Sequence, residues 1–283
     1  MGSFSILNNI SALNAQNQLN LNNVNLSRTL SRLSSGKRIN SGADDAAGLQ
    51  IADSLRANVY ALNQSIRNAN DGIGVAQIAD GALQEITNLL TRAVTLAEEA
   101  ATETVDLNGR TSLQSEFTSI QAEIARIATQ ANFNGAYLFT PEGLVDGKLS
   151  VFVGDMTSSS TIDVTIDSIG AAGDTVTDLG GTSLAGVDLI NEPSSALTTI
   201  QAALNAVAAM RGTIGAGMNR LQSAVAVLQT QVQNTQSAES TIRDANMAEE
   251  IVNLTKQQIL AQSGMAALAQ ANANSQNVLN LLR

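Results

Sequence analysis

The sequence predicts a mainly α-helical protein, a long antiparallel coiled-coil helical bundle with a small β-hairpin insert in the middle of the chain. Three observations predict this fold class. Residues 1–135 and 194–283 contain no proline and carry apolar residues at helical spacing. Residues 136–190 are instead rich in Gly, Thr and Asp, with short alternating runs that are typical of strands. An apolar seam with alternating steps of three and four continues through five heptads of the C-terminal part.

Composition excludes most catalytic and metal chemistry. The chain has 283 residues and a formal net charge of -10, with no His, no Cys and no Trp. Without imidazole or thiol groups there is no Ser-His-Asp triad, no Cys nucleophile, no structural zinc site and no disulfide. An acidic chain is also a poor ligand for nucleic acids and anionic membranes. We therefore predict no enzyme, no cofactor, no metal, no nucleic-acid partner and no membrane partner.

The N-terminal segment has two apolar stripes and almost no charge. Residues 1–27 contain no charged side chain, and the following cluster of Arg28, Arg32, Lys37 and Arg38 is interpreted as a solvated linker. One stripe consists of Ala12, Ala15, Leu19, Leu26 and Leu33, and the other of Ile6, Ile10, Leu13 and Val24. Since the stripes lie on different faces, one partner helix cannot cover both.

The C-terminal segment has the same character. Residues 257–282 contain no charged side chain. Ile251, Leu254, Met265 and Leu268 follow one track, whereas Ile259, Leu260, Val278 and Leu279 lie off it. We expect both ends to be mobile in the free subunit and to fold when subunits assemble. The residues predicted to form this inner assembly core are Ile10, Leu13, Leu19, Val24, Leu26, Ile251, Leu254, Ile259, Met265, Leu268, Val278, Leu279 and Leu282. A frayed, silent tail and a membrane-surface helix are the alternatives, and the second lacks a basic face.

The middle helices are predicted to pair along an apolar seam. Its members are Leu55, Leu62, Ile66 and Ile73 on the N-terminal side, and Leu204, Ile214, Leu221 and Leu228 on the C-terminal side. Arg211 is the single polar position of the C-terminal seam. Gly212, Gly215 and Gly217 weaken this helix, so we expect them to permit close approach of another helix. The alternative is an ordinary amphipathic bundle that does not assemble with other subunits, because it would have the same periodicity.

The insert at 136–190 is predicted to hold surface-exposed hairpins. Residues 149–153 and 161–167 are β-rich runs, and Asp146-Gly147 is a hairpin-turn signal. Its aspartates lack the spacing of a calcium loop, so we interpret them as solvated.

Several motifs resemble those of bacterial flagellins. The run LSSGKRINSGADDAAGL at 33–49 and its extension IRNANDG at 66–72 resemble the N-terminal signature of the family. The C-terminal end is similar as well, with QILAQSG at 258–264, LAQAN at 268–272 and QNVLNLLR at 276–283. Phe133-Asn134-Gly135 also matches where the helical zone ends. The insert is short, so the chain resembles a flagellin with a reduced central variable region.

The resemblance implies a structural subunit that polymerises into the flagellar filament for motility. It implies export in an unfolded state by the flagellar type III system, and an extracellular location without a cleaved signal peptide. Residues 1–43 and 247–283 would form the filament inner core, disordered in the monomer. Residues 44–135 and 191–246 would form the outer-tube bundle. Implied partners are other copies of the chain, a flagellar secretion chaperone at the C-terminal helix, and the filament cap and hook-junction proteins. A hook-filament junction protein and a helical-bundle adhesion or binding module remain alternatives.

The resemblance also implies a candidate contact with Toll-like receptor 5. By alignment from residues 81–83, the central Arg, Leu and Glu of the family's receptor patch correspond to Arg92, Leu96 and Glu116. The surrounding residues depart from the family pattern at Val94, Thr95, Glu98 and Glu99.

Overall fold

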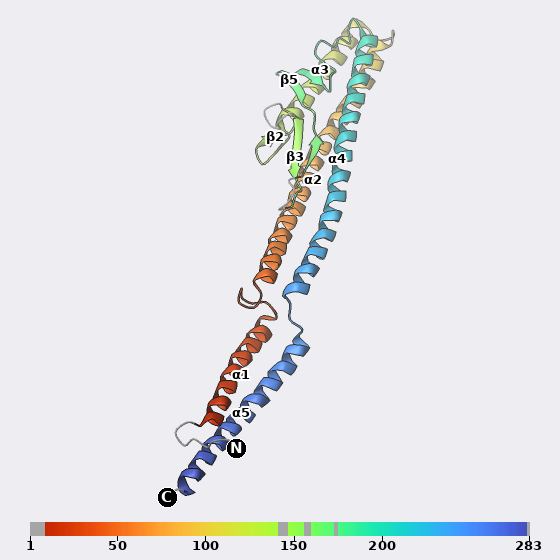
Figure 1. Cartoon of the computed structure of the whole chain (residues 1–283). Helices are drawn as coiled ribbons and strands as arrows, with labels where there is room; N and C mark the ends of the chain where they lie inside the picture. The colour runs from red at the N-terminus through yellow and green to blue at the C-terminus, as the bar shows by residue number, and fades with distance from the viewer. Residues whose placement is uncertain (1–8, 141–146, 156–159, 173–174, 282–283) are drawn as a thin grey trace. The chain divides into compact units, whose positions relative to one another are not determined.

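The computed structural model describes residues 9–140, 147–155, 160–172 and 175–281 of the chain. Its elements are α1 (Ile10–Ser35), α2 (Ala46–Ala101), α3 (Leu107–Gln130), β1 (Asn132–Phe133), β2 (Ala136–Tyr137), β3 (Lys148–Phe152), β4 (Thr161–Thr165), β5 (Ile169–Ala172), β6 (Thr175–Leu179), α4 (Pro193–Arg243) and α5 (Met247–Leu281) (Figure 1). Within this part of the chain the strands form three separate antiparallel pairs. The predicted fold class, long helices with small mid-chain hairpins, is confirmed.

The chain divides into two compact units, residues 1–57 with 234–283 and residues 58–233. In the second unit, α2 and α4 run antiparallel. Arg211 Nε lies 2.8 Å from Asp80 Oδ1, and Leu221 of α4 approaches Gly72 further toward the start of α2. The polar position of the seam therefore has a partner of opposite charge on the facing helix.

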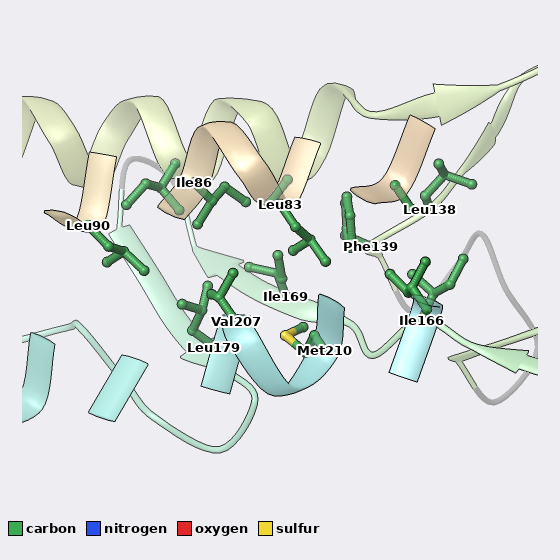
Figure 2. Close-up of a cluster of buried hydrophobic side chains, with 14 of the residues drawn as sticks. Leu83, Ile86, Leu90, Leu138, Phe139, Ile166, Ile169, Leu179, Val207 and Met210 are labelled. Carbon is green, nitrogen blue, oxygen red and sulfur yellow. The ribbon is translucent and has the colours of Figure 1, made fainter. Parts of the chain in front are cut away.

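Apolar side chains from every element of the second unit except the β1–β2 hairpin form one core (Figure 2). Leu83, Ile86 and Leu90 of α2 face Val207 and Met210 of α4, with Ile169 and Leu179 of the β5–β6 hairpin between them. The seam residues Leu62, Ile214, Leu221 and Leu228 are buried here, and Ile66, Ile73 and Leu204 are partly buried against the core. Leu55 belongs to the first unit and is half-buried.

The long hairpin β3–β4 lies against α2 and α4 through two glycines. A Cβ added at Gly72 would lie 2.5 Å from Val151, and one at Gly217 would lie 2.7 Å from Val164. Gly212 and Gly215 have nothing within 4 Å. The expectation of close helix approach is therefore wrong for this glycine group, because a strand occupies the space beside Gly217.

The insert has one buried face and one exposed face. Val151, Val164 and Ile166 point into the core, whereas Lys148 and Phe152 are exposed. Ser150 Oγ donates to Asp163 Oδ1 at 2.7 Å across the β3–β4 pair, so this aspartate is held by its neighbouring strand. Asp146 of the predicted turn lies outside the described residues.

Side-chain amides of α3 hold the segment that leads into α4. Gln121 is buried and donates to the Leu184 carbonyl at 2.7 Å. Gln114 both donates to the Val187 carbonyl and accepts from the Leu189 amide. These bonds satisfy backbone groups that no regular secondary structure pairs.

Candidate assembly surface

The first unit is built on α1 and α5, which lie antiparallel and in close contact (Figure 1). Asn9 caps the start of α1 with its Oδ1, and its Nδ2 donates to the Ala271 carbonyl and to Ser275 Oγ. Thirteen residues later, Asn22 donates to the Gln257 carbonyl at 2.8 Å. Polar side chains therefore cross from one helix to the backbone of the other at two separate levels.

The seam between the two helices contains small and medium apolar residues. Leu19 and Leu26 of α1 and Leu254 and Leu268 of α5 are half-buried there. A Cβ at Gly264 would lie 3.3 Å from Leu19 Cδ1, which shows how closely the two helices approach. The first predicted stripe of α1 thus faces α5.

The second apolar stripe of α1 is left exposed. Ile10, Leu13 and Val24 lie on the side of α1 opposite the seam, and Val24 is 57% exposed. On α5, Ile259 and Met265 point to two different sides and are both more than half exposed. This unit therefore presents apolar area on several sides.

Two predicted inner-core residues of α5, Ile251 and Met265, lie together on an exposed side of this helix. The sequence pattern groups them with Leu254 and Leu268, which the structure places at the seam with α1. The side chains of Val278 and Leu279 lie outside those that the structure describes, and Leu282 lies outside the described residues. Exposed apolar area of this extent marks an interaction site.

The segments that connect these helices to α2 and α4 are joined by backbone hydrogen bonds. Arg38 N donates to the Arg243 carbonyl at 2.7 Å, and Ala245 N donates to the Gly36 carbonyl at 3.0 Å. Gly36 ends α1 in the left-handed conformation, with φ at 69°. The two connections therefore leave their helices side by side.

Ion pairs reinforce this connection. Arg32 lies 3.5 Å from Glu250, which is buried at the start of α5, and 3.9 Å from Asp44. Arg243 Nη1 lies 3.0 Å from Asp53 Oδ1. Burial opposes ionisation of Asp44, but hydrogen bonds from the Ser41 amide and hydroxyl and the Asn40 amide outweigh it and lower its pKa.

Sequence reasoning missed this network. The interpretation of the basic cluster as a solvated linker is wrong for Arg32, which is three-quarters buried and paired with two carboxylates. One signal was present: residues 1–43 hold four basic side chains and no acidic one, so any carboxylate partner had to come from outside this segment, as Asp44 and Glu250 do. Glu249 and Glu250 in the first turn of α5 were the nearest candidates on the facing helix.

The candidate receptor residues are only partly at the surface. Arg92 Nη2 lies 2.7 Å from Glu116 Oε1, and this pair between α2 and α3 is exposed. Leu96 is fully buried in the core. The Leu96 side chain packs between the helices instead of facing solvent, so Arg92 and Glu116 are the members of this group that a partner could reach, and the receptor contact stays a prediction.

Comparisons with known proteins agree with these features. The family model of the bacterial flagellin N-terminal helical region matches residues 6–142, and that of the flagellin C-terminal helical region matches residues 197–282. This chain belongs to the bacterial flagellin family. A flagellar filament 33 kDa core protein of Treponema phagedenis is 37% identical to it, over 98% of this chain and 99% of that protein. Flagellins of Halalkalibacterium halodurans and Bacillus subtilis are 36% and 35% identical over the same shares.

This flagellin is a structural subunit of a bacterial filament, as the sequence predicted. Its family consists of structural proteins that polymerise with copies of themselves and are exposed outside the cell. Among the helices that the structure describes, none has the length and apolar character required to cross a membrane.

Proposed function

We propose that the α1–α5 unit is the surface through which this flagellin polymerises, and that it forms the inner core of the filament. The observation that carries the proposal is the second apolar stripe of α1, which lies opposite α5 and is exposed at Ile10, Leu13 and Val24. A second copy of the chain supplies a matching surface, because Ile259 and Met265 leave α5 apolar on two further sides. Each α1 would then lie between its own α5 and a helix of a neighbouring subunit.

The absence of charge favours burial of this surface over exposure. Residues 1–27 and 257–282 carry no charged side chain, so burying them desolvates no unpaired ion. Apolar area removed from water contributes about 25 cal/mol per Å², and many copies in a filament add these contributions. Polar Asn, Gln and Ser side chains between the apolar residues can pair across the interface, as Asn9 and Asn22 already do within the subunit.

The same properties support the finer steps that the family resemblance implies. The α1–α5 pair is a two-helix unit with a narrow seam, so it gains most of its burial from other subunits. We infer that the chain is exported unfolded by the flagellar type III system, and that a secretion chaperone covers the apolar sides of α5 before export. At the growing end, cap and hook-junction proteins would contact the same helices until the next subunit arrives.

A matched pair of substitutions tests the assembly surface. Val24→Asp places a charge in the exposed stripe, whereas Asn23→Asp places the same charge one residue away, about 100° around α1. Neither changes the α1–α5 seam, because both side chains are exposed. We expect Val24→Asp to raise the critical concentration for filament formation by about ten-fold or more, and Asn23→Asp to leave it near the wild-type value. Normal polymerisation of Val24→Asp would contradict the proposal.

A further inference from the structure

Two methionines lie on the exposed side of α5. Met247 is 44% exposed and Met265 is 54% exposed. They are 18 residues apart, which is five turns at about 3.6 residues per turn, so both lie on the same face of the helix. Ile251 belongs to this exposed side as well, and Leu254 and Leu268 border it at the α1 seam.

The remaining described methionines are shielded. Met210 is only 3% exposed in the core of the second unit, and Met218 is partly buried against the same core. Met1 and Met156 lie outside the described residues. The chain has no cysteine, so the methionine thioethers are its sulfur groups open to oxidation.

We propose that Met247 and Met265 are oxidation sites that decide whether a free subunit can join a filament. One molecule of hydrogen peroxide transfers one oxygen atom to each thioether sulfur, and the rest of the peroxide leaves as water. The thioether is oxidised to a sulfoxide and the peroxide is reduced. This inference depends on the proposed function, because it assumes that the exposed side of α5 becomes an interface.

Oxidation changes the polarity of this apolar side of α5. A sulfoxide converts an apolar, flexible side chain into a strongly polar one. On the free subunit the new oxygen is hydrated and costs little. In an apolar interface the oxygen would lose this water, beside Ile251 in the case of Met247, and a buried acceptor that loses its water opposes association. Oxidation therefore acts on assembly while leaving the folded second unit unchanged.

Assembly should also protect the two sites. In a free subunit, peroxide reaches Met247 and Met265 from solvent. In a filament built through this face, neighbouring subunits cover both sulfur atoms. Oxidised chains would thus be excluded from growth, whereas chains already in the filament keep their thioethers.

The test uses the full-length subunit and dilute hydrogen peroxide. Peptide mass spectrometry at successive times gives the oxidation rate of each methionine in free subunits and in filaments, and light scattering gives the critical concentration. We expect Met247 and Met265 to oxidise about ten-fold or more faster than Met210 in the free subunit, and to be protected in filaments. The critical concentration should rise about ten-fold or more after oxidation. Methionine sulfoxide reductases A and B should restore it.

Two variants assign the effect to these residues. Leucine is similar in volume to methionine and has no sulfur, so the Met247→Leu, Met265→Leu double variant should assemble normally and continue to do so after peroxide. The control variant, Met210→Leu, should lose assembly on oxidation as the wild type does. If the double variant assembles poorly before treatment, the oxidised wild-type subunit is used instead. Recovery of its assembly after treatment with the two reductases then shows whether methionine oxidation caused the loss.

The outcomes separate this inference from the proposed function. An untreated subunit that forms no filaments, with its α1–α5 surface still solvent-accessible, would refute the proposed function itself. Filaments from fully oxidised subunits at an unchanged critical concentration would overturn only the methionine inference. Loss of assembly in the peroxide-treated double variant would overturn it too, because oxidation would then act at another site.

Discussion

Val164 Cγ1 in β4 lies 2.7 Å from the position that a Cβ at Gly217 in α4 would occupy. Val151 of the paired strand β3 has the same relationship with Gly72 of α2, at 2.5 Å. One hairpin thus contacts both long helices at positions where neither has a side chain. The flat surface at these two glycines allows the insert to contribute its buried valines to the core of the second unit.

Substituting these glycines should destabilise the second unit. Gly217→Ala and Gly72→Ala each force a strand residue away from its helix, and we expect a loss of about 1–3 kcal/mol in the free energy of unfolding. Gly212→Ala is the matched control on α4, because nothing lies within 4 Å of that position. Removing a helical glycine there should stabilise the protein by about 0.5–1 kcal/mol. Urea unfolding of the three variants checks both signs, and equal destabilisation by Gly212→Ala would contradict this account.

The Asp80–Arg211 pair should contribute little to stability. Both side chains are about one-third exposed, at 32% each, and exposed ion pairs contribute about 0.2–1 kcal/mol. Its hydrogen bond with Asp80 raises the pKa of Arg211, so the guanidinium stays charged throughout the accessible pH range. We expect a double-mutant cycle with Asp80→Asn and Arg211→Met to give a coupling energy within that range. A coupling well above it would show that the pair fixes the register of α2 against α4.

Asp44 should make the first unit sensitive to acid. Its folded-state pKa is lowered, so the folded state binds fewer protons than the unfolded state in the acidic range. The stabilisation is complete above the unfolded pKa of about 3.9 and is lost as pH falls through the lower folded value. Asp44→Asn should remove this dependence. Hydrogen exchange at the Asn40 and Ser41 amides, which donate to Asp44, provides the readout.

In the wild type, exchange at these two amides should accelerate once the pH falls below about 4, relative to the intrinsic rate. In Asp44→Asn it should already be fast at neutral pH and change little on acidification. Protection that persists to low pH in the wild type would mean that the carboxylate does not hold this segment.

The buried side-chain amide of Gln121 should contribute more to stability than the exposed side chains of α3. Its Nε2 donates to the Leu184 carbonyl at 2.7 Å, and its side chain is almost fully buried. Gln121→Met keeps the volume and leaves that carbonyl with only the longer bond from the Val187 amide at 3.4 Å, which should cost about 0.5–1.5 kcal/mol. Thr118→Val, at an exposed position of the same helix, should change stability by less than about 0.5 kcal/mol. Thermal unfolding of both variants compares the two costs.

Periodicity predicted the parts of the fold that depend on one helix at a time. The seam through Ile214, Leu221 and Leu228 is buried as expected, and the two stripes of α1 separate into a seam at Leu19 and Leu26 and an exposed face at Ile10 and Leu13. Spacing within a helix fixes these faces, because each residue advances by a constant angle.

Relationships between distant segments were not predictable in this way. Nothing in the sequence around Gly217 shows that Val164 fills the space beside it, since the contact depends on where a hairpin lies. Arg32 and Glu250 are 218 residues apart, and their pairing depends on the antiparallel arrangement of α1 and α5. Family alignment places Leu96 in the same stretch of helix as Arg92. Alignment alone does not show which side of the helix a side chain occupies.

The most direct test of the assembly surface is hydrogen exchange of the free subunit and of the filament, compared amide by amide. We predict that amides in α1 and α5 exchange rapidly in the free subunit and become strongly protected in the filament, while most core amides of residues 58–233 are protected in both. Equal protection of α1 and α5 before and after polymerisation would contradict the claim that these two helices bury their exposed apolar sides against neighbouring subunits.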